Sequence, residues 1–451
     1  MAKNSVLSWS FVIALGGFLF GFDTAVISGA EKAVQIYWDL SEFQHGVTMA
    51  IALIGTVVGA AMGAYPSDRF GRKNTLFMVA ALYFFSALGT ALAYDWYVFI
   101  LFRFLGGIGV GVSSVTAPIY ISEIAPADRR GKLVGLFQFN VVLGILIAYL
   151  SNYFIGFLGE NSWRLMLGVQ AFPAALFFVL IFSIPKSPRW LLLHRNDREG
   201  ALKVLKRIND KNHHEELANI EAAAKRDASK AGHSIFSKKY RKPVLLAVLF
   251  AIFNQVSGIN AIIYYAPRVF EMAGLGAQSS LLSTVGIGLV NFSFTLIAIN
   301  FIDKVGRRKL MLIGSVGLIA ALSLVSYSFY AHESGGSENI LVSGMAITVY
   351  LMIYIAFFAF SQGAVIWVFI SEIFPNEVRA KGQTLGSLTH WVMAAIITFF
   401  FPVLSAYLGG GTTFLLFAGF MVLQLLFVIK LMPETKGRSL EAIEEGNIIL
   451  H

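Results

Sequence analysis

Two stretches of this sequence carry the same charged phrase: residues 68–73 read DRFGRK, and residues 303–309 read DKVGRRK. Each follows a long apolar stretch, and the two copies begin 235 positions apart. Two further phrases repeat in the same order: SEIAPADRRGK at 122–132 with SEIFPNEVRAKG at 371–382, and PKSPR at 185–189 with PETKGR at 433–438. Three phrases in one order at a nearly constant offset predict an internal duplication of roughly 240 residues.

The apolar stretches between these phrases predict a membrane protein. The chain is 57% hydrophobic and only 14% charged. A helix needs about 20 apolar residues to span the hydrocarbon core of a bilayer. Continuous rather than alternating runs favour helices over strands. We therefore expect an all-α integral membrane protein with twelve transmembrane helices, at about 8–30, 46–66, 74–94, 97–120, 132–156, 163–183, 243–267, 279–301, 309–331, 341–370, 380–407 and 411–432.

The repeat and the one long polar segment divide the chain into four parts. We expect an N-terminal six-helix bundle at 1–183, a helical linker at 184–242, a C-terminal six-helix bundle at 243–432 and a tail at 433–451. The linker holds His213-His214-Glu215-Glu216, which could be taken for a metal site. A solvated helix face is the better interpretation, because nothing nearby has ligand spacing. No metal and no cofactor is expected.

The basic residues predict the orientation. With twelve helices, 31 of the 35 Lys and Arg residues fall on one face of the membrane. Lys32, Arg164 and Arg268 fall on the other face, and Arg103 lies inside a predicted helix. Basic loops are cytoplasmic, so both termini, the linker and the tail are expected inside the cell. The net charge of +9 then reflects topology and anionic lipid headgroups, and a nucleic-acid partner is not expected.

Several features argue against an enzyme. GGIGVG at 106–111 follows no strand and lies inside an apolar run, so its glycines predict close helix packing and not a phosphate-binding loop. The sequence has no cysteine, no Walker loop and no Ser–His–acid or paired-carboxylate pattern of a catalytic site. The first apolar run lacks a small-residue cleavage site, which indicates a retained helix.

Two charged residues stand within predicted membrane helices, Asp23 in GGFLFGFDTAVISGA and Arg103 in FRFLGGIGVG. A buried charge in a bilayer costs about 2.5–3.5 kcal/mol, so it usually faces a cavity or a partner. One interpretation is a fixed ion pair that ties the first helix to the fourth. The other, which we favour, is a carboxylate whose proton affinity depends on the distance to Arg103.

Uncharged polar residues within the predicted helices form a second set. Amides donate and accept hydrogen bonds as hydroxyls do, and indole rings stack on the apolar face of a sugar. Any single amide is explained as well by a helix–helix hydrogen bond, but the set favours a cavity for a neutral polyhydroxyl ligand. The set comprises Gln138, Asn254, Gln255, Asn260, Tyr264, Asn291, Trp367, His390 and Trp391.

From about Gly16 to Glu445 the sequence resembles the sugar porters of the major facilitator superfamily, and bacterial proton–xylose symporters in particular. The resemblance rests on nine phrases in order: GGFLFGFDTAVISG, DRFGRK, RFLGGIGVG, YISEIAPADRRGKL, PKSPRWLL, QVSGINAIIYYAP, DKVGRRK, SEIFPNEVRAKG and PETKGRSLEAIE. It implies the major facilitator fold, two pseudo-symmetric six-helix bundles with a sugar held between them and exposed to each side in turn.

The resemblance also implies roles for single residues. Asp23 matches the aspartate of proton-coupled members, with Arg103 as its partner. Phe20 would line the cavity, and sugar contacts are implied for Gln138, Gln255, Asn260, Tyr264, Asn291, Trp367 and Trp391. The repeated phrases would supply salt bridges that close the cytoplasmic side, from Asp68, Arg69, Arg72, Glu123, Arg129, Asp303, Arg307, Arg308, Glu372 and Arg379.

Three departures from the family pattern affect the site. Asn254 stands where the family often has a first glutamine, and His390 stands where it has Asn or Gln before the tryptophan. The imidazole of His390 can hydrogen-bond a hydroxyl, but it can also titrate near neutral pH. The stretch GAVIW at 363–367 lacks the proline that many relatives have after the glycine.

The sequence thus predicts a proton-coupled importer of a monosaccharide, hexose or pentose, that works by alternating access as a monomer in the inner or plasma membrane. The nearest alternative is a facilitative carrier in which Asp23 is structural. A sugar sensor that does not transport ranks below it, and an enzyme is last.

Overall fold

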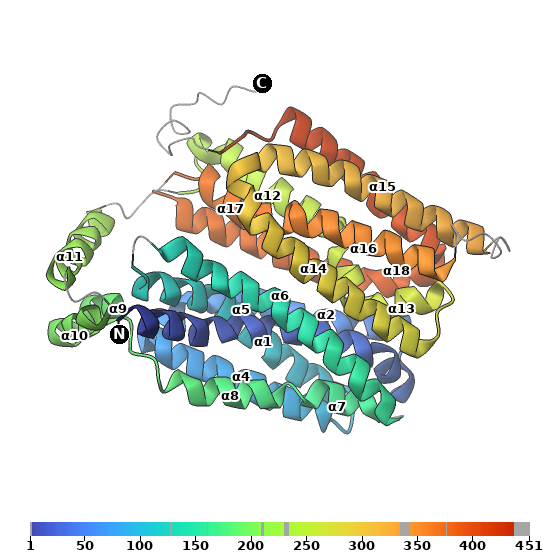
Figure 1. The fold of residues 1–451 in the computed structure, drawn as a ribbon, viewed down its shortest axis with the longest axis horizontal. Coiled ribbons are helices and arrows are strands. Elements are labelled where there is room, and N and C mark those ends of the chain that lie inside the picture. The colour runs from blue at the N-terminus through green and yellow to red at the C-terminus, as the bar shows by residue number, and fades with distance from the viewer. Residues whose placement is uncertain are drawn as a thin grey trace. The chain divides into compact units, whose positions relative to one another are not determined.

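The computed structural model describes residues 2–126, 129–159, 161–208, 212–229, 234–333, 343–375 and 377–436, and every regular element in these ranges is a helix (Figure 1). The α-helices are α1 (Ala2–Tyr37), α2 (Glu42–Met62), α3 (Ala64–Phe70), α4 (Arg72–Ala91), α5 (Trp96–Ile124), α6 (Arg130–Ile155), α7 (Ser162–Gly168), α8 (Ala171–Ile181), α9 (Pro188–Arg195), α10 (Arg198–Ile208), α11 (His213–Ser229), α12 (Arg241–Val256), α13 (Ile259–Met272), α14 (Ala277–Val305), α15 (Arg307–Glu333), α16 (Gly344–Phe360), α17 (Gln362–Ile373) and α18 (Arg379–Lys430). Short 3₁₀ turns occupy Gly156–Leu158 and Lys238–Tyr240.

Eleven helical segments among the described residues are long and apolar enough to cross a membrane. The last, α18, has 52 residues, which as one straight helix would measure about 78 Å against a hydrocarbon core of roughly 30 Å. It reverses at Gly409, whose φ of 76° and ψ of 166° are not helical. Glu372 in α17, seven residues before α18, accepts a hydrogen bond from Thr435, five residues after α18, so the chain returns to the side on which α18 began. Counting α18 as two crossings gives the twelve predicted helices.

The described chain divides into two compact units. The first comprises Met1–Val26, Ile51–Ala148 and Arg164–Gly232, and the second comprises Ile27–Ala50, Tyr149–Trp163 and His233–His451. Helices α1, α2 and α6 therefore contribute to both units. The predicted boundaries at 183 and 243 stay a prediction.

Glycine allows close packing of α5 in the first unit, as the GGIGVG stretch predicts. A Cβ atom on Gly107 or Gly111 would overlap the backbone of Ala52 or Thr56 in α2. Membrane helices approach this closely only through small residues. The motif lies inside a helix, so its interpretation as a packing surface is confirmed.

The first copies of the three repeated phrases form one cluster in the first unit. The Nε atom of Arg72 donates to both carboxylate oxygens of Glu123, at 3.2 and 3.0 Å. The hydroxyl of Ser187 donates to Glu123 Oε2 at 2.5 Å, and Arg72 Nη1 also pairs with Asp68 at 2.8 Å. Each of the three phrases thus contributes a side chain to one charged cluster.

The second copies build the same cluster in the second unit. Arg307 donates to Glu372 at 3.1 and 2.7 Å and pairs with Asp303 at 2.9 Å. Thr435, at the position that matches Ser187, donates to Glu372 Oε2 at 2.6 Å. The duplication read from the sequence is therefore present in side-chain geometry as well as in the phrases.

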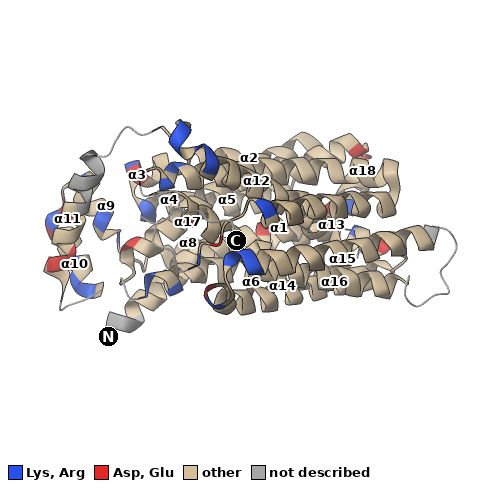
Figure 2. Cartoon of the chain, turned by 90° about the horizontal axis from the view of Figure 1, so that it is seen from above, with Lys and Arg blue, Asp and Glu red and all other residues tan. Residues whose placement is uncertain are grey.

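The linker between the repeats is helical in its described part, as predicted. Helix α9 packs against α3 and α5 of the first unit, and α10 and α11 follow it in the chain (Figure 1). Helices α10 and α11 carry many charged residues (Figure 2). The indole of Trp190 in α9 donates to the Asp68 carbonyl at 2.6 Å, and the guanidinium of Arg207 in α10 lies 4.7 Å from the Trp9 ring centre. Most of the predicted tail, residues 437–451, lies outside the described residues.

We expect Gly71→Ala to destabilise the first unit. Gly71 has φ 90° and ψ 153°, a conformation open essentially to glycine alone, and an added Cβ would lie 2.9 Å from the Trp190 ring. The strain should cost about 1–3 kcal/mol and lower the apparent melting temperature of the purified protein, followed by tryptophan fluorescence. Gly131→Ala is the control, because this exposed helical glycine has nothing within 4 Å. Equal melting temperatures for the two variants would contradict the conclusion that position 71 requires glycine.

Candidate functional site

Asp23 and Arg103 form a buried ion pair in the first unit, as the sequence predicts. Arg103 Nη1 donates to Asp23 Oδ1 at 3.0 Å, and the two residues are 2% and 3% exposed. The pair joins α1 to α5. Within the described residues, Nε and the second terminal nitrogen of Arg103 have no hydrogen-bond partner.

This geometry leaves the ion pair able to change. A single hydrogen bond uses one of the five N–H donors of a guanidinium, so Arg103 can take a further acceptor. The hydroxyls of Tyr83 in α4 and of Ser113 in α5 are also fully buried in this unit, and they interact with each other. Arg103 thus keeps unused hydrogen-bonding capacity although it is buried.

The amide residues of the second unit form one hydrogen-bonded cluster. Gln255 Nε2 donates to Asn254 Oδ1 at 2.9 Å and lies 3.2 Å from both ring nitrogens of His390. Asn260 Nδ2 donates to Gln255 Oε1 at 2.6 Å. All four residues are at least nine-tenths buried. Gln255 is therefore the centre of the cluster.

A helix break places these amides beside one another. Helix α12 ends at Val256 and α13 begins at Ile259, with Gly258 between them in the left-handed conformation at φ 87°. The Tyr354 hydroxyl donates to the Ser257 carbonyl at 3.0 Å and so satisfies backbone that the break leaves free. The break turns Asn260 back toward Gln255.

Aromatic rings flank the cluster. The ring centre of His390 lies 4.9 Å from that of Trp367 and 4.8 Å from that of Trp391. Trp367 lies on α17, which is separated from α16 by a break at Ser361, with φ −116° and ψ −88°. The missing proline of GAVIW therefore does not prevent a break next to this stretch.

The structure brings together six of the predicted ligand-binding residues, all in the second unit. Tyr264 and Asn291, on α13 and α14, are buried in the same unit. Phe20 and Gln138 belong to the first unit, where the Phe20 ring lies 6.5 Å from that of Phe137. A role of all these residues in binding one ligand remains a prediction.

The predicted gating residues lie in different surroundings. Those in the two charged clusters are described above. Arg69 is exposed and contacts the Tyr65 hydroxyl. Arg308 donates to the Ile429 carbonyl at 2.8 Å, Arg379 donates to the Phe374 carbonyl at 3.3 Å, and Arg129 is exposed.

Sequence reasoning missed several residues that complete these sites. Glu434 accepts from the backbone N–H groups of Arg307 and Arg308, at 3.0 and 3.1 Å. The place of Ser187 and Thr435 at the same position of repeated phrases was the signal available for the two hydroxyls. Glu31 and His45, paired at 2.7 Å, were missed because each stands at the edge of an apolar run. Among the described residues no group of three or more His, Cys, Asp or Glu side chains could hold a metal ion.

The fold and these sites define a polytopic transporter rather than an enzyme. A sequence profile described as "Sugar (and other) transporter" matches residues 9–446. The chain is 38% identical to the arabinose-proton symporter of Bacillus subtilis over 98% of this chain and 94% of that protein, and 34% identical to the D-xylose-proton symporter of Escherichia coli over 98% and 96%. The solved xylose transporter XylE of E. coli, partially occluded and inward-open, matches with a TM-score of 0.85 and 33% identity over 97% of this chain and all of that one. The chain belongs to the sugar transporter family and has the major facilitator fold, which confirms the resemblance read from its phrases.

We expect Arg103→Met to destabilise the protein strongly. Removing one partner of a buried ion pair leaves an uncompensated charge and costs about 3–5 kcal/mol. The double variant Asp23→Asn, Arg103→Met should recover most of that loss, because the buried charge is then gone. Apparent melting temperatures of the purified variants test this. A single variant as stable as the parent would show that the pair is not a buried charge pair.

Proposed function

We propose that this protein imports a monosaccharide together with a proton by alternating access. The observation that carries the proposal is the buried Asp23–Arg103 pair within a sugar-transporter fold. Relatives named as proton symporters for arabinose and for D-xylose support it. We further propose that it works as a monomer in the cell membrane with both termini inside, as its basic loops indicate.

The amide cluster is the proposed sugar site. Gln255 currently satisfies its amide through Asn254, Asn260 and His390. A bound sugar would replace these contacts with hydroxyls, which donate and accept as amides do. Trp367 and Trp391 would supply apolar ring faces. Tyr264 and Asn291 of the second unit, and Phe20 and Gln138 of the first, are proposed as further sugar contacts. A relative described as a proton:xylose symporter and solved with 6-bromo-6-deoxy-D-glucose supports a pentose or a hexose as the ligand.

Coupling follows from the competition for Asp23. When Arg103 is near, the carboxylate is stabilised in its charged form; when Arg103 is distant, burial favours the protonated form. If the distance changes during each cycle, a proton binds on one side and leaves on the other. One proton crossing 100 mV releases about 2.3 kcal/mol, enough for roughly 50-fold accumulation of sugar.

The two charged clusters are the proposed cytoplasmic gate. Each cluster places a buried arginine, Arg72 or Arg307, beside a glutamate at helix ends. Each ion pair joins two residues of the same repeat. To act as a gate, these residues would have to exchange ion-pair partners when the conformation changes. A modest bias is enough, because a near-balanced equilibrium responds to small energies.

A facilitative carrier is the second candidate. The closed, 3.0 Å contact between Asp23 and Arg103 also suits a fixed tie between α1 and α5. In that case the protein would equilibrate sugar across the membrane without concentrating it.

The Asp23→Asn variant separates the two candidates. The amide is nearly isosteric with the acid but cannot titrate, so the variant should exchange sugar between liposomes and buffer yet fail to concentrate it. The measurement is uptake of labelled arabinose, D-xylose and D-glucose into proteoliposomes, with and without an imposed proton gradient. His390→Gln, assayed in parallel, should retain accumulation. Uphill uptake by Asp23→Asn would remove the proton role from this residue.

Gln255→Ala tests the sugar site. The variant leaves sugar hydroxyls unpaired in a buried cavity, which should cost about 1–3 kcal/mol, or roughly 5- to 150-fold in affinity. Calorimetric titration with the sugar that the wild type binds best measures the loss. Asn300→Ala, which truncates an exposed amide on α14, is the control and should bind normally. Unchanged affinity in Gln255→Ala would exclude this residue from the site.

A further inference from the structure

A second buried ionic cluster lies in the second unit, and its Glu31 follows Asp23 by eight residues on α1. Glu31 on α1 and His45 on α2 are 1% and 0% exposed. His45 Nε2 lies 2.7 Å from Glu31 Oε2. Arg268 on α13 reaches the same carboxylate, with Nε 2.9 Å from Oε1 and a terminal nitrogen 2.8 Å from Oε2. One carboxylate thus has two cationic or potentially cationic partners on two other helices.

The surroundings of His45 are otherwise poor in charge. From α13 the Tyr265 ring meets the imidazole edge-on at 5.9 Å, and its hydroxyl donates to a backbone carbonyl of α18. From α2 itself Glu42 is the nearest acid, and it accepts from Gln35 at 3.0 Å. Within the described residues, His45 Nδ1 has no hydrogen-bond partner. The pair Lys32 and Glu271 lies further out, where each residue neutralises the other.

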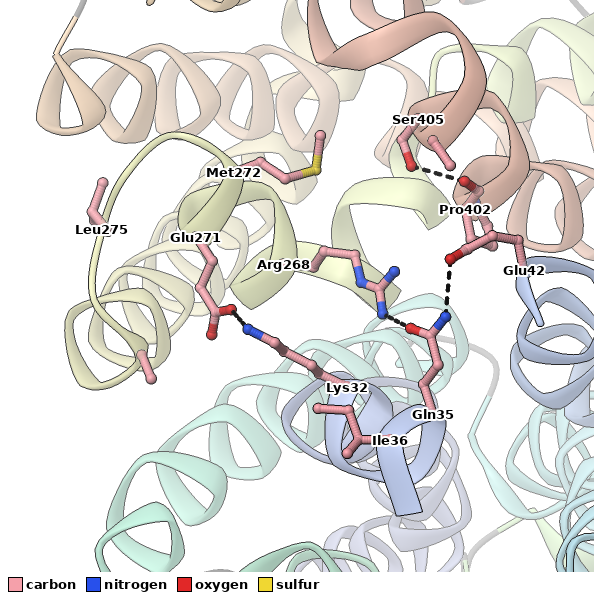
Figure 3. Close-up of a pocket in the computed structure, with 12 residues that line it drawn as sticks. Lys32, Gln35, Ile36, Glu42, Arg268, Glu271, Met272, Leu275, Pro402 and Ser405 are labelled. Atoms are coloured by element: carbon pink, nitrogen blue, oxygen red, sulfur yellow. Dashed lines mark hydrogen bonds and ion pairs between the residues drawn. The ribbon is translucent and has the colours of Figure 1, made fainter. Parts of the chain in front are cut away.

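Arg268 lies between this cluster and water. It lines a cavity of about 730 Å³ together with Lys32, Gln35, Glu42, Glu271 and Met272. Figure 3 shows its guanidinium contacting Gln35, which in turn contacts Glu42, while Lys32 and Glu271 pair across the opening. Glu31 and His45 are fully buried, whereas the Arg268 side chain is 16% exposed. Arg268 is therefore the member of the cluster with room to move.

The negative charge of Glu31 can be neutralised either by Arg268 or by a proton on His45. With Arg268 in place, Glu31 is neutralised by a guanidinium on both oxygens, and a charged His45 would add an unpaired positive charge. If Arg268 withdraws, Glu31 is left as a buried anion without a counter-charge, which is costly. A proton on His45 restores neutrality through the existing 2.7 Å contact.

We propose that Glu31 and His45 form a second proton-binding site, which gains a proton when Arg268 withdraws and loses it when Arg268 returns. The proposal adds to the proposed function and relies on it only for the movement of α13 during transport. By linkage, acid solution then favours withdrawal of Arg268, because the withdrawn state binds the extra proton. For one proton the ratio of withdrawn to closed forms changes by up to roughly tenfold per pH unit.

The test is a distance measurement that needs neither sugar nor transport. The native chain has no cysteine, so Ile36→Cys on α1 and Ala277→Cys on α14 can carry spin labels on two lining positions of the cavity. Distance distributions are recorded between about pH 5.5 and about pH 8, the range in which histidine changes charge. We expect a longer distance to gain population as the pH falls in the parent, and this response to disappear in His45→Gln.

Two further variants guard the test. Arg268→Gln removes the competitor for Glu31, so the longer distance should dominate at every pH and provide a readout should His45→Gln fail to fold. Asp23→Asn should keep the pH response, because that carboxylate is not part of the cluster. A pH-independent distance in the parent, or an unchanged response in His45→Gln, would overturn the proposal. If the parent showed the pH-dependent distance but no uphill sugar uptake, the proposed function alone would be contradicted.

Discussion

Inside a bilayer no water is available to a buried charge or amide, and this constraint accounts for the polar contacts of this protein. Asp23 is paired with Arg103, and Glu31 with His45 and Arg268. Both contacts join residues on different helices. These ion pairs therefore hold their helices together. A movement of one of these helices has to replace the partner of each buried charge with another partner. This is the physical basis on which binding of a proton or a sugar can be linked to a change of conformation.

The duplicated clusters follow the same rule at the helix ends. In each copy a glycine with positive φ lets the chain turn before a helix, and the arginine that follows binds a glutamate from another helix. A hydroxyl from the third phrase then satisfies the glutamate oxygen that remains. The arginine, the glutamate and the hydroxyl of each cluster come from the three different phrases, so losing one phrase would leave a charged or polar group of the others without its partner. This accounts for the repetition of all three phrases. The two halves have kept the contact and not merely the residues.

Much of this could be predicted from the sequence, because apolar length and charge placement are strong signals in a membrane protein. The twelve helices, the glycine packing and the Asp23–Arg103 pair were predictable on that basis. The roles of Ser187 and Thr435 were missed, because a hydroxyl has no charge signal and its partner is 63 or 64 positions away in the chain, so only their matching place in the repeated phrases pointed to them. Glu31 was missed because α1 continues to Tyr37, beyond the end of its apolar run. The hydrogen bond from Asn260 to Gln255 depends on the helix break at Gly258, whose geometry only the structure supplies.

The reversal at Gly409 has a consequence for biosynthesis. Between Lys381 and Lys430 the sequence has no Asp, Glu, Lys or Arg, and the turn leaves almost no polar loop between the two crossings. A nascent chain of this kind offers the insertion machinery no charge at which to stop between the two helices. The last two helices should therefore enter the lipid as one hairpin, with its orientation decided by the basic residues at its two ends.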